Sequence, residues 1–150
     1  MQVRRFQWTK TFRENKTGDQ RQKIKDRTSM HNFRELKVWQ KAIEFSVEIY
    51  KITTSFPTEE KFGLISQLRR SAVSIPSNIA EGSSRTSNKE FFHFLSISIG
   101  SAYESETQII IANRLKYVSD TDFEELTRKV TEIQKMLNSF SEIIKNNFSK

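Results

Sequence analysis

The chain has 150 residues, 35% of them hydrophobic, and carries 25 lysines and arginines against 18 acidic residues. This length favours one domain with a buried core, and the absence of cysteine excludes disulfides and thiolate zinc sites. No apolar run reaches the ~20 residues of a membrane span and no signal peptide is visible, so we expect a cytoplasmic protein without a membrane partner.

Residues 1–32 read as a basic tail. They hold 9 of the bases and 3 of the acids, so they account for +6 of the net charge of +7. They are rich in Lys, Arg, Gln and Thr and show no sustained apolar period, which predicts disorder. The tail therefore precedes a nearly neutral folded domain, residues 33–150.

Two interpretations of the tail stay open. Bases alternate with aromatic residues around Arg5, Phe6, Trp8 and Lys10, as in an arm that neutralises phosphates and stacks on bases. Alternatively, Met30 is the natural start and the preceding residues are an over-extended reading frame. The abrupt change in composition near Met30 favours the second interpretation.

The first helix is expected over residues 34–53, and it carries two apolar stripes. The stripe that we expect to face the core contains Leu36, Trp39, Ile43, Val47 and Tyr50. The second stripe, which one chain would not need for its own core, contains Val38, Ala42, Phe45, Ile49 and Ile52.

The second helix is expected to begin at the cap residue Thr58 and to end at Gly82 in the C′ position. Pro76 interrupts it without breaking its apolar phase, so the pattern predicts a helix that kinks and continues. The proline leaves the carbonyl of Ala72 without its usual N–H donor, and the nearby hydroxyls of Ser74 and Ser77 could bind the freed carbonyls.

A third helix is expected from the capping box Ser87–Glu90 to about Leu115. A fourth starts at a second capping box, Thr121–Glu124, and has the clearest amphipathic spacing in the chain. Four long helices with short connections predict an all-α, antiparallel up-down-up-down four-helix bundle.

The segment 91–99 of the third helix is apolar in nearly every direction. Three partner helices leave one face of such a helix in water, so we expect another copy of the chain to cover that face in a homo-oligomer. The alternative is a monomer that hides Phe91 or Phe94 under its tail.

Polar residues around Pro76 form one predicted cluster. We expect a structural hydrogen-bond network between the second and third helices, made by Asn78, Glu81, Ser101 and Glu104.

Four bases of the folded domain are the best candidates for contact with phosphate: Arg69, Arg70, Arg85 and Lys89. Equally, Arg69 or Arg70 could pair with Glu104 or Glu106 of a neighbouring subunit.

Glu90 and His93 have the Glu-x-x-His spacing of di-iron bundles. That chemistry needs a second such motif, and the other histidine, His31, lies outside the bundle; Glu90 already serves as a cap. With no phosphate loop or nucleophile–base pair, we expect no metal, no cofactor, no catalytic residue and no enzyme.

Several spaced motifs occur together and carry a family resemblance: Phe33-x-x-Leu36-x-x-Trp39, Phe56-Pro57, Phe62-Gly63-Leu64, Gln67–Ala72, Ser74–Arg85 and Gly100-Ser101-x-x-Glu104-x-Glu106. Over about residues 31–146 the chain resembles the four-helix-bundle proteins encoded in intervening sequences of bacterial 23S rRNA genes. It is more distantly similar to the accessory variability determinants of diversity-generating retroelements.

The resemblance implies a closed ring of subunits, typically five, and retroelement relatives that bind nucleic acid and a reverse transcriptase. We therefore expect a non-enzymatic oligomeric adaptor for RNA or a nucleoprotein complex. The alternative is a protein-binding scaffold without nucleic-acid contact. Because the folded domain here is nearly neutral, unlike the basic retroelement proteins, direct transfer of their role is weakened.

Overall fold

The structure is a computed structural model that describes residues 32–149. This part of the chain contains no strand and has four long helices: α2 (Lys37–Ile52), α3 (Leu64–Ser83), α4 (Asn88–Arg114) and α5 (Asp120–Asn146). Three 3-10 turns complete it: η1 (Phe33–Glu35), η2 (Thr53–Ser55) and η3 (Thr58–Phe62). The predictions on the tail and on Met30 lie outside the described residues.

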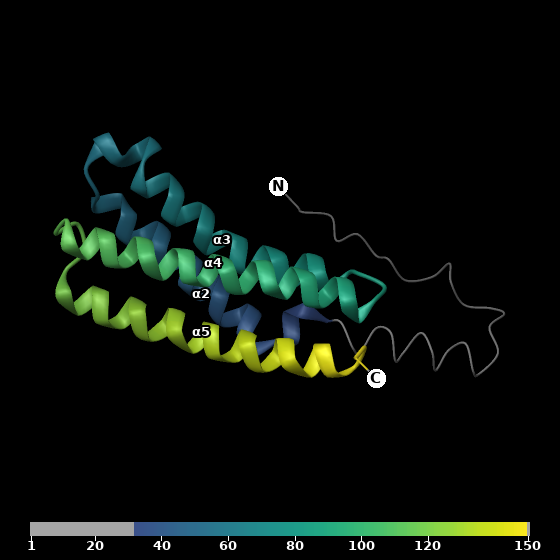
Figure 1. Ribbon diagram of the computed structural model, residues 1–150. Coiled ribbons are helices and arrows are strands. Elements are labelled where there is room, and N and C mark those ends of the chain that lie inside the picture. The colour runs from purple at the N-terminus through teal and green to yellow at the C-terminus, as the bar shows by residue number, and fades with distance from the viewer. Residues whose placement is uncertain (1–31, 150) are drawn as a thin grey trace, which may run out of the picture. The chain divides into compact units, whose positions relative to one another are not determined.

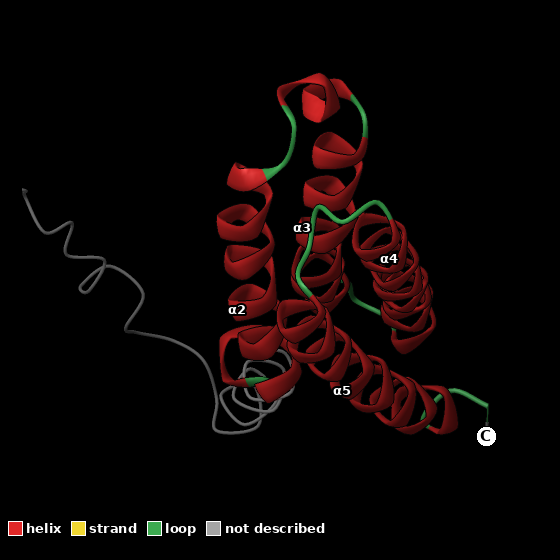
Figure 2. Cartoon of the chain, turned by 90° about the vertical axis from the view of Figure 1, so that its left-hand side faces the viewer, coloured by secondary structure: helices red, strands yellow, loops and turns green. Residues whose placement is uncertain are grey.

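The helices form a four-membered bundle. Each contacts two neighbours, in the cycle α2–α3, α3–α4, α4–α5 and α5–α2. Successive helices are joined at alternating ends (Figure 1), and the view along them places α3 between α2 and α4 with α5 below (Figure 2). The predicted all-α bundle is confirmed, whereas the closed ring stays a prediction. No helix in the described range is both long and apolar enough to cross a membrane.

The core is filled by side chains at 3-4 spacing from all four helices. The fully buried ones with the largest volume include Phe45, Ile49, Leu68, Ile75, Ile79, Phe91, Leu95, Ile109, Ile133 and Leu137. The apolar spacing that we predicted for the second and fourth helices is confirmed, since Leu68, Ile75 and Ile79 of α3 and Ile133 and Leu137 of α5 are buried.

The prediction for the first helix was wrong about which stripe faces the core. Val38, Ala42, Phe45 and Ile49 of the second stripe are buried. The expected core stripe instead leaves Ile43 38%, Val47 48% and Tyr50 47% exposed. Both stripes have helical spacing, so periodicity could not decide which one the neighbouring helices would cover.

The second helix begins later than predicted. Thr58 opens the short turn η3 and makes no side-chain cap, and α3 starts only at Leu64. There the Glu60 carboxylate accepts a 2.8 Å hydrogen bond from the Leu64 N–H. The acidic residue Glu60 thus serves the N-terminus of α3.

Gly82 was wrongly predicted as a C′ residue, because α3 includes it and continues to Ser83. Helix α4 lies against Gly82: a Cβ added to this glycine would lie 2.7 Å from Phe91 Cδ2 and 2.8 Å from Phe94 Cβ. The close packing of α4 therefore leaves no room for a side chain at position 82.

The capping box of α4 is confirmed, since Ser87 Oγ accepts from the Glu90 N–H at 3.2 Å. The second box lies two residues earlier than predicted. Ser119, not Thr121, is the N-cap of α5, and its Oγ accepts from the Asp122 N–H at 3.1 Å. Both sites offer a hydroxyl residue followed by an acid three positions later, so the sequence alone left the register ambiguous.

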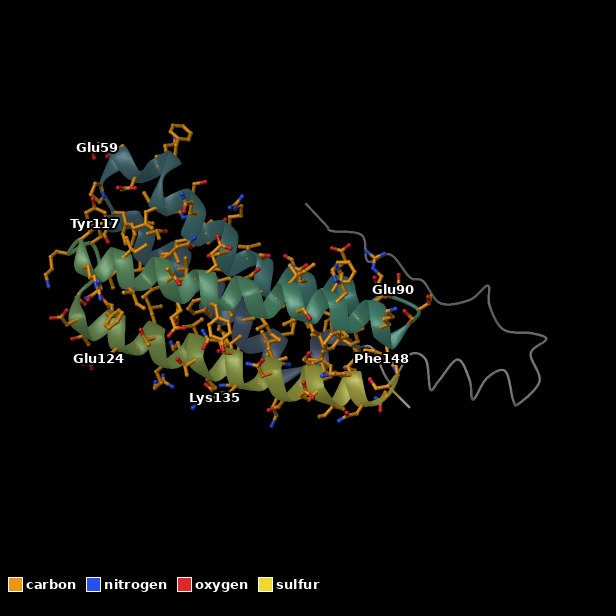
Figure 3. The ribbon with its side chains drawn as sticks, in the orientation of Figure 1. Glu59, Glu90, Tyr117, Glu124, Lys135 and Phe148 are labelled. Atoms are coloured by element: carbon orange, nitrogen blue, oxygen red, sulfur yellow. The ribbon has the colours of Figure 1, made fainter. Side chains whose placement is uncertain are left out.

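The apolar segment 91–99 is better covered by its own chain than predicted. Phe91 is buried, Phe92 stacks edge-on with Phe148 of the C-terminal segment, and Phe94 lies under Arg85. Glu90 and Phe148 mark this end of the bundle in Figure 3. Ile97 alone in this segment is a largely exposed hydrophobic, so α4 gives less reason for assembly than the sequence suggested.

Helix α3 continues through Pro76, as predicted; the bend that we expect there stays a prediction. The carbonyl of Ala72, which lacks an N–H donor from Pro76, accepts a 2.9 Å hydrogen bond from Ser46 Oγ on α2. The same hydroxyl lies 2.7 Å from the Ala42 carbonyl of α2, so its one proton is shared between the two carbonyls. Ser74 and Ser77, which we expected to serve the freed carbonyls, make no such bond in the described residues; Ser74 Oγ instead accepts from other side chains. A neighbouring helix therefore compensates for the proline.

We predict that Ser46→Ala destabilises the fold by about 1–3 kcal/mol, because a buried carbonyl loses its donor. In a Pro76→Ala background the same change should cost less than about 1 kcal/mol, because residue 76 then has an N–H for Ala72. Urea unfolding of the four proteins, followed by circular dichroism, measures both costs. Equal costs in the two backgrounds would contradict this account of Pro76.

Candidate interaction surfaces

Two of the four candidate phosphate-binding residues are committed to the fold. Arg69 Nε donates to Thr53 Oγ1 at 2.8 Å, and its guanidinium lies 4.7 Å above the Tyr50 ring. It therefore ties α3 to the C-terminal end of α2. Arg85 pairs with Glu81 at 2.5 Å and lies 4.7 Å above the Phe94 ring, so it holds the turn between α3 and α4.

The other two candidates are less engaged within the described residues. The Arg70 side chain is 78% exposed and reaches only a 3.9 Å ion pair with Glu104 of its own chain. Lys89 is exposed, and it makes no side-chain hydrogen bond or ion pair within residues 32–149. Arg70 lies in the second turn of α3, whereas Lys89 lies in the first turn of α4, beyond the other end of α3. The helical rise from Arg70 to the end of α3 alone is roughly 20 Å, so these two bases of the described residues do not form one patch.

The predicted polar network divides into parts. In the first part, Asn78 Nδ2 donates to Ser74 Oγ at 2.9 Å, and Ser101 Oγ on α4 donates to the same oxygen at 2.9 Å. Glu81 lies apart from it, exposed and paired with Arg85.

The second part continues the seam between α3 and α4 by one turn. Ser105 Oγ donates to Ser71 Oγ at 2.8 Å, and Ser71 Oγ donates to Gln108 Oε1 at 2.8 Å. Gln108 Nε2 then donates to Glu104 at 3.1 Å. Sequence reasoning missed Ser71, Ser105 and Gln108. The signal was the 3-4-3 spacing of Ser98, Ser101, Ser105 and Gln108, which gives one face of α4 a buried polar stripe.

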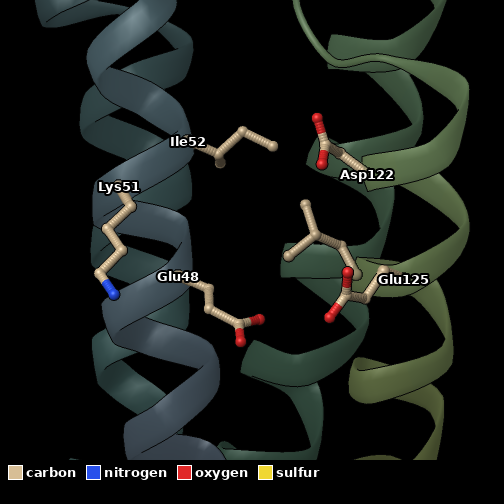
Figure 4. Close-up of a pocket in the computed structure, with 6 residues that line it drawn as sticks. Glu48, Lys51, Ile52, Asp122 and Glu125 are labelled. Atoms are coloured by element: carbon tan, nitrogen blue, oxygen red, sulfur yellow. The ribbon is translucent and has the colours of Figure 1, made fainter.

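An ion-pair cluster flanks the contact between α2 and α5. Figure 4 shows Glu48 on α2 facing Glu125 on α5, with Asp122 above, around a cleft of about 410 Å³. The Lys129 ammonium binds Glu48 and, at 2.7 Å, Glu125. In the described residues, no group of three or more His, Cys, Asp or Glu is arranged to hold a metal. Through the ion pair of Lys129 on α5 with Glu48 on α2, the cluster forms a charged clamp between these helices.

These contacts set the titration of the clamp. Hydrogen bonds to Glu125 and Glu48 raise the pKa of Lys129, and the hydrogen bond from Lys129 lowers the pKa of Glu125. The clamp therefore stabilises the fold at neutral pH. Its contribution is lost when pH falls through the lowered pKa of Glu125 or rises through the raised pKa of Lys129.

One exposed apolar surface of the described residues lies on α2 and α3. Ile43, Val47 and Tyr50 of α2 and Val73 of α3 are all at least 38% exposed, and they line one open groove of about 570 Å³. Lys51 and Arg69 are its charged lining residues. We call this surface the α2–α3 groove. Single exposed hydrophobic residues are common on soluble proteins, but a contiguous set from two helices indicates an interaction site.

Comparisons with known proteins agree with the fold. A family model described as "23S rRNA-intervening sequence protein" matches residues 34–139. A crystal structure of a protein of unknown function from the S23 ribosomal protein family of Bacteroides thetaiotaomicron is 31% identical, with a TM-score of 0.66. The match covers 70% of this chain and 95% of that one. A search of curated proteins found no match.

We predict that Arg69→Met destabilises the fold by about 1–2 kcal/mol, because Thr53 and Tyr50 lose a charged hydrogen-bond donor and a stacked cation. The neighbouring change Arg70→Met is the matched control and should cost less than about 0.5 kcal/mol, because its only ion pair is exposed. Thermal unfolding of both variants measures the difference. Similar losses for the two arginines would contradict the structural role of Arg69.

Proposed function

Because the chain belongs to the 23S rRNA-intervening sequence protein family, we propose that it is a non-enzymatic, self-assembling adaptor that binds RNA or a nucleoprotein complex. Copies of the chain associate through the α2–α3 groove, and the assembled copies together contact the nucleic acid. The ring of about five subunits that the family resemblance implies is the assembly that we expect.

The observation that supports this proposal most strongly is the exposed apolar surface of the α2–α3 groove. One chain buries the inner stripe of α2 and leaves Ile43, Val47 and Tyr50 largely in water. Burial of that surface against another copy would remove apolar area from water at about 25 cal/mol per Å². Self-association is therefore the favoured way to cover it.

Assembly also accounts for how a nearly neutral domain could bind RNA. Of the four candidates in the folded domain, Arg70 and Lys89 are the two left uncommitted within the described residues, and they lie far apart. In a symmetric oligomer each residue recurs once per subunit, so weak phosphate contacts act together on one RNA. The alternative is a scaffold that binds proteins alone, a reverse transcriptase among them, and it needs no such contacts.

We predict that Val47→Lys dissociates the assembly, because a charged side chain would enter the apolar part of the groove. Light scattering should give the wild-type protein a mass of several times 17.7 kDa and the variant a mass near 17.7 kDa. Ile143→Lys is the control, since Ile143 is an exposed hydrophobic on α5 and does not line the groove. A wild-type mass of one chain at high protein concentration would refute self-assembly.

For RNA binding, we expect the full-length protein to bind single-stranded RNA at low salt and to lose affinity steeply as salt rises. The double variant Arg70→Gln, Lys89→Gln should bind more weakly and show a shallower salt dependence, because fewer phosphates are neutralised. Fluorescence anisotropy with labelled RNA at several salt concentrations measures both. No saturable binding at low salt would favour the protein-only scaffold.

A further inference from the structure

Phe62 is the most exposed large hydrophobic residue in the described part of the chain, at 88%. It ends the turn η3, beyond the tips of α2 and α3, and its ring has only the ammonium of Lys61 within cation–π range, at 5.5 Å. Figure 3 shows Glu59, from the same turn, at this extreme end of the bundle. A phenylalanine in this position contributes nothing to the core of its own chain.

The turn that carries Phe62 is held in a fixed shape. The Glu60 N–H donates to the Pro57 carbonyl and the Gly63 N–H donates to the Glu60 carbonyl, both at 3.0 Å. The Glu60 carboxylate caps α3 at Leu64, and a Cβ on Gly63 would lie 2.5 Å from that carboxylate. The ring is therefore presented on a preorganised support, which lowers the entropy lost when it binds.

The α2–α3 groove has properties that complement this turn. Its floor is apolar. An aromatic ring that enters the groove could contact the edge of the Tyr50 ring and the Arg69 guanidinium that lies over that ring. Its charged lining residues, Lys51 and Arg69, are both positive. The turn Thr58–Phe62 carries two acids, Glu59 and Glu60, and one base. Charge and polarity thus match between the groove and the turn.

We propose that Phe62 of one copy inserts into the α2–α3 groove of the next copy. This inference rests on the self-assembly proposed above and names the two surfaces that meet. Phe62 does not line the groove of its own chain, so each copy offers one groove and one Phe62. We take the contact to be heterologous, because a reciprocal exchange between two copies would stop at a dimer. Heterologous contacts repeat from copy to copy and close into a ring when the rotation permits.

The test is complementation between two variants, followed by light scattering. Phe62→Ser keeps the groove but lacks the inserted ring, and Val47→Lys keeps the ring but blocks the groove. Each variant alone should be monomeric or self-associate at least about thirtyfold more weakly, the effect of removing a hot-spot side chain. Mixed together, they should form a 1:1 dimer, in which Phe62 of the Val47→Lys chain enters the groove of the Phe62→Ser chain. This dimer cannot extend, because that one contact uses the only intact groove and the only intact Phe62 of the pair.

Ile143→Ser, which removes another exposed hydrophobic residue, is the control and should keep the wild-type mass. Phe62 is so exposed that its substitution should leave the circular dichroism spectrum of the folded chain unchanged, which separates loss of binding from loss of folding. If Phe62→Ser assembles like the wild type, or if the mixture stays monomeric, the insertion is refuted while self-assembly stands. A monomeric wild type would refute both.

Discussion

The bundle depends on how helix α3 satisfies its backbone between α2 and α4. Pro76 removes one intrahelical hydrogen bond in the buried part of α3, and Ser46 of α2 supplies the missing donor to Ala72. On the other side, Ser98 of α4 donates to the carbonyl of Ile75 at 2.9 Å. Serine hydroxyls can reach these carbonyls only if the helices approach closely. Small side chains along both contacts therefore fix the position of α3.

This constraint decides which surfaces remain for other molecules. The seam between α3 and α4 is closed by Gly82 and by serine hydroxyls that bond to one another, so these side chains are already engaged within the chain. Arg69 and Arg85 are held by aromatic rings and hydrogen bonds within the chain. Among the exposed hydrophobic residues of the described fold, Ile43, Val47 and Tyr50 lie together on the outer side of α2. A function that depends on association between copies follows from this distribution more directly than one that depends on a basic patch.

Most of the fold could be predicted from the sequence, because apolar spacing and caps are local signals. The number of helices, the continuity of α3 through Pro76 and the cap at Ser87 are confirmed. The inner stripe of α2 and the partner of the freed Ala72 carbonyl were missed, since both are set by contacts between helices. The candidate phosphate-binding residues were harder to predict. Their charge and position can be read from the sequence, but only the packing shows that Arg69 is bonded to Thr53 and Arg85 to Glu81.

The central claim is that another copy of the chain covers the α2–α3 groove, and the reactivity of a thiol placed there tests it most directly. The natural sequence contains no cysteine, so Val47→Cys would introduce one thiol at the exposed face of α2. Its rate of alkylation should fall as protein concentration rises and copies associate, whereas Ile143→Cys on α5 should react at a constant rate. A Val47→Cys thiol that reacts equally fast at every concentration would contradict the account.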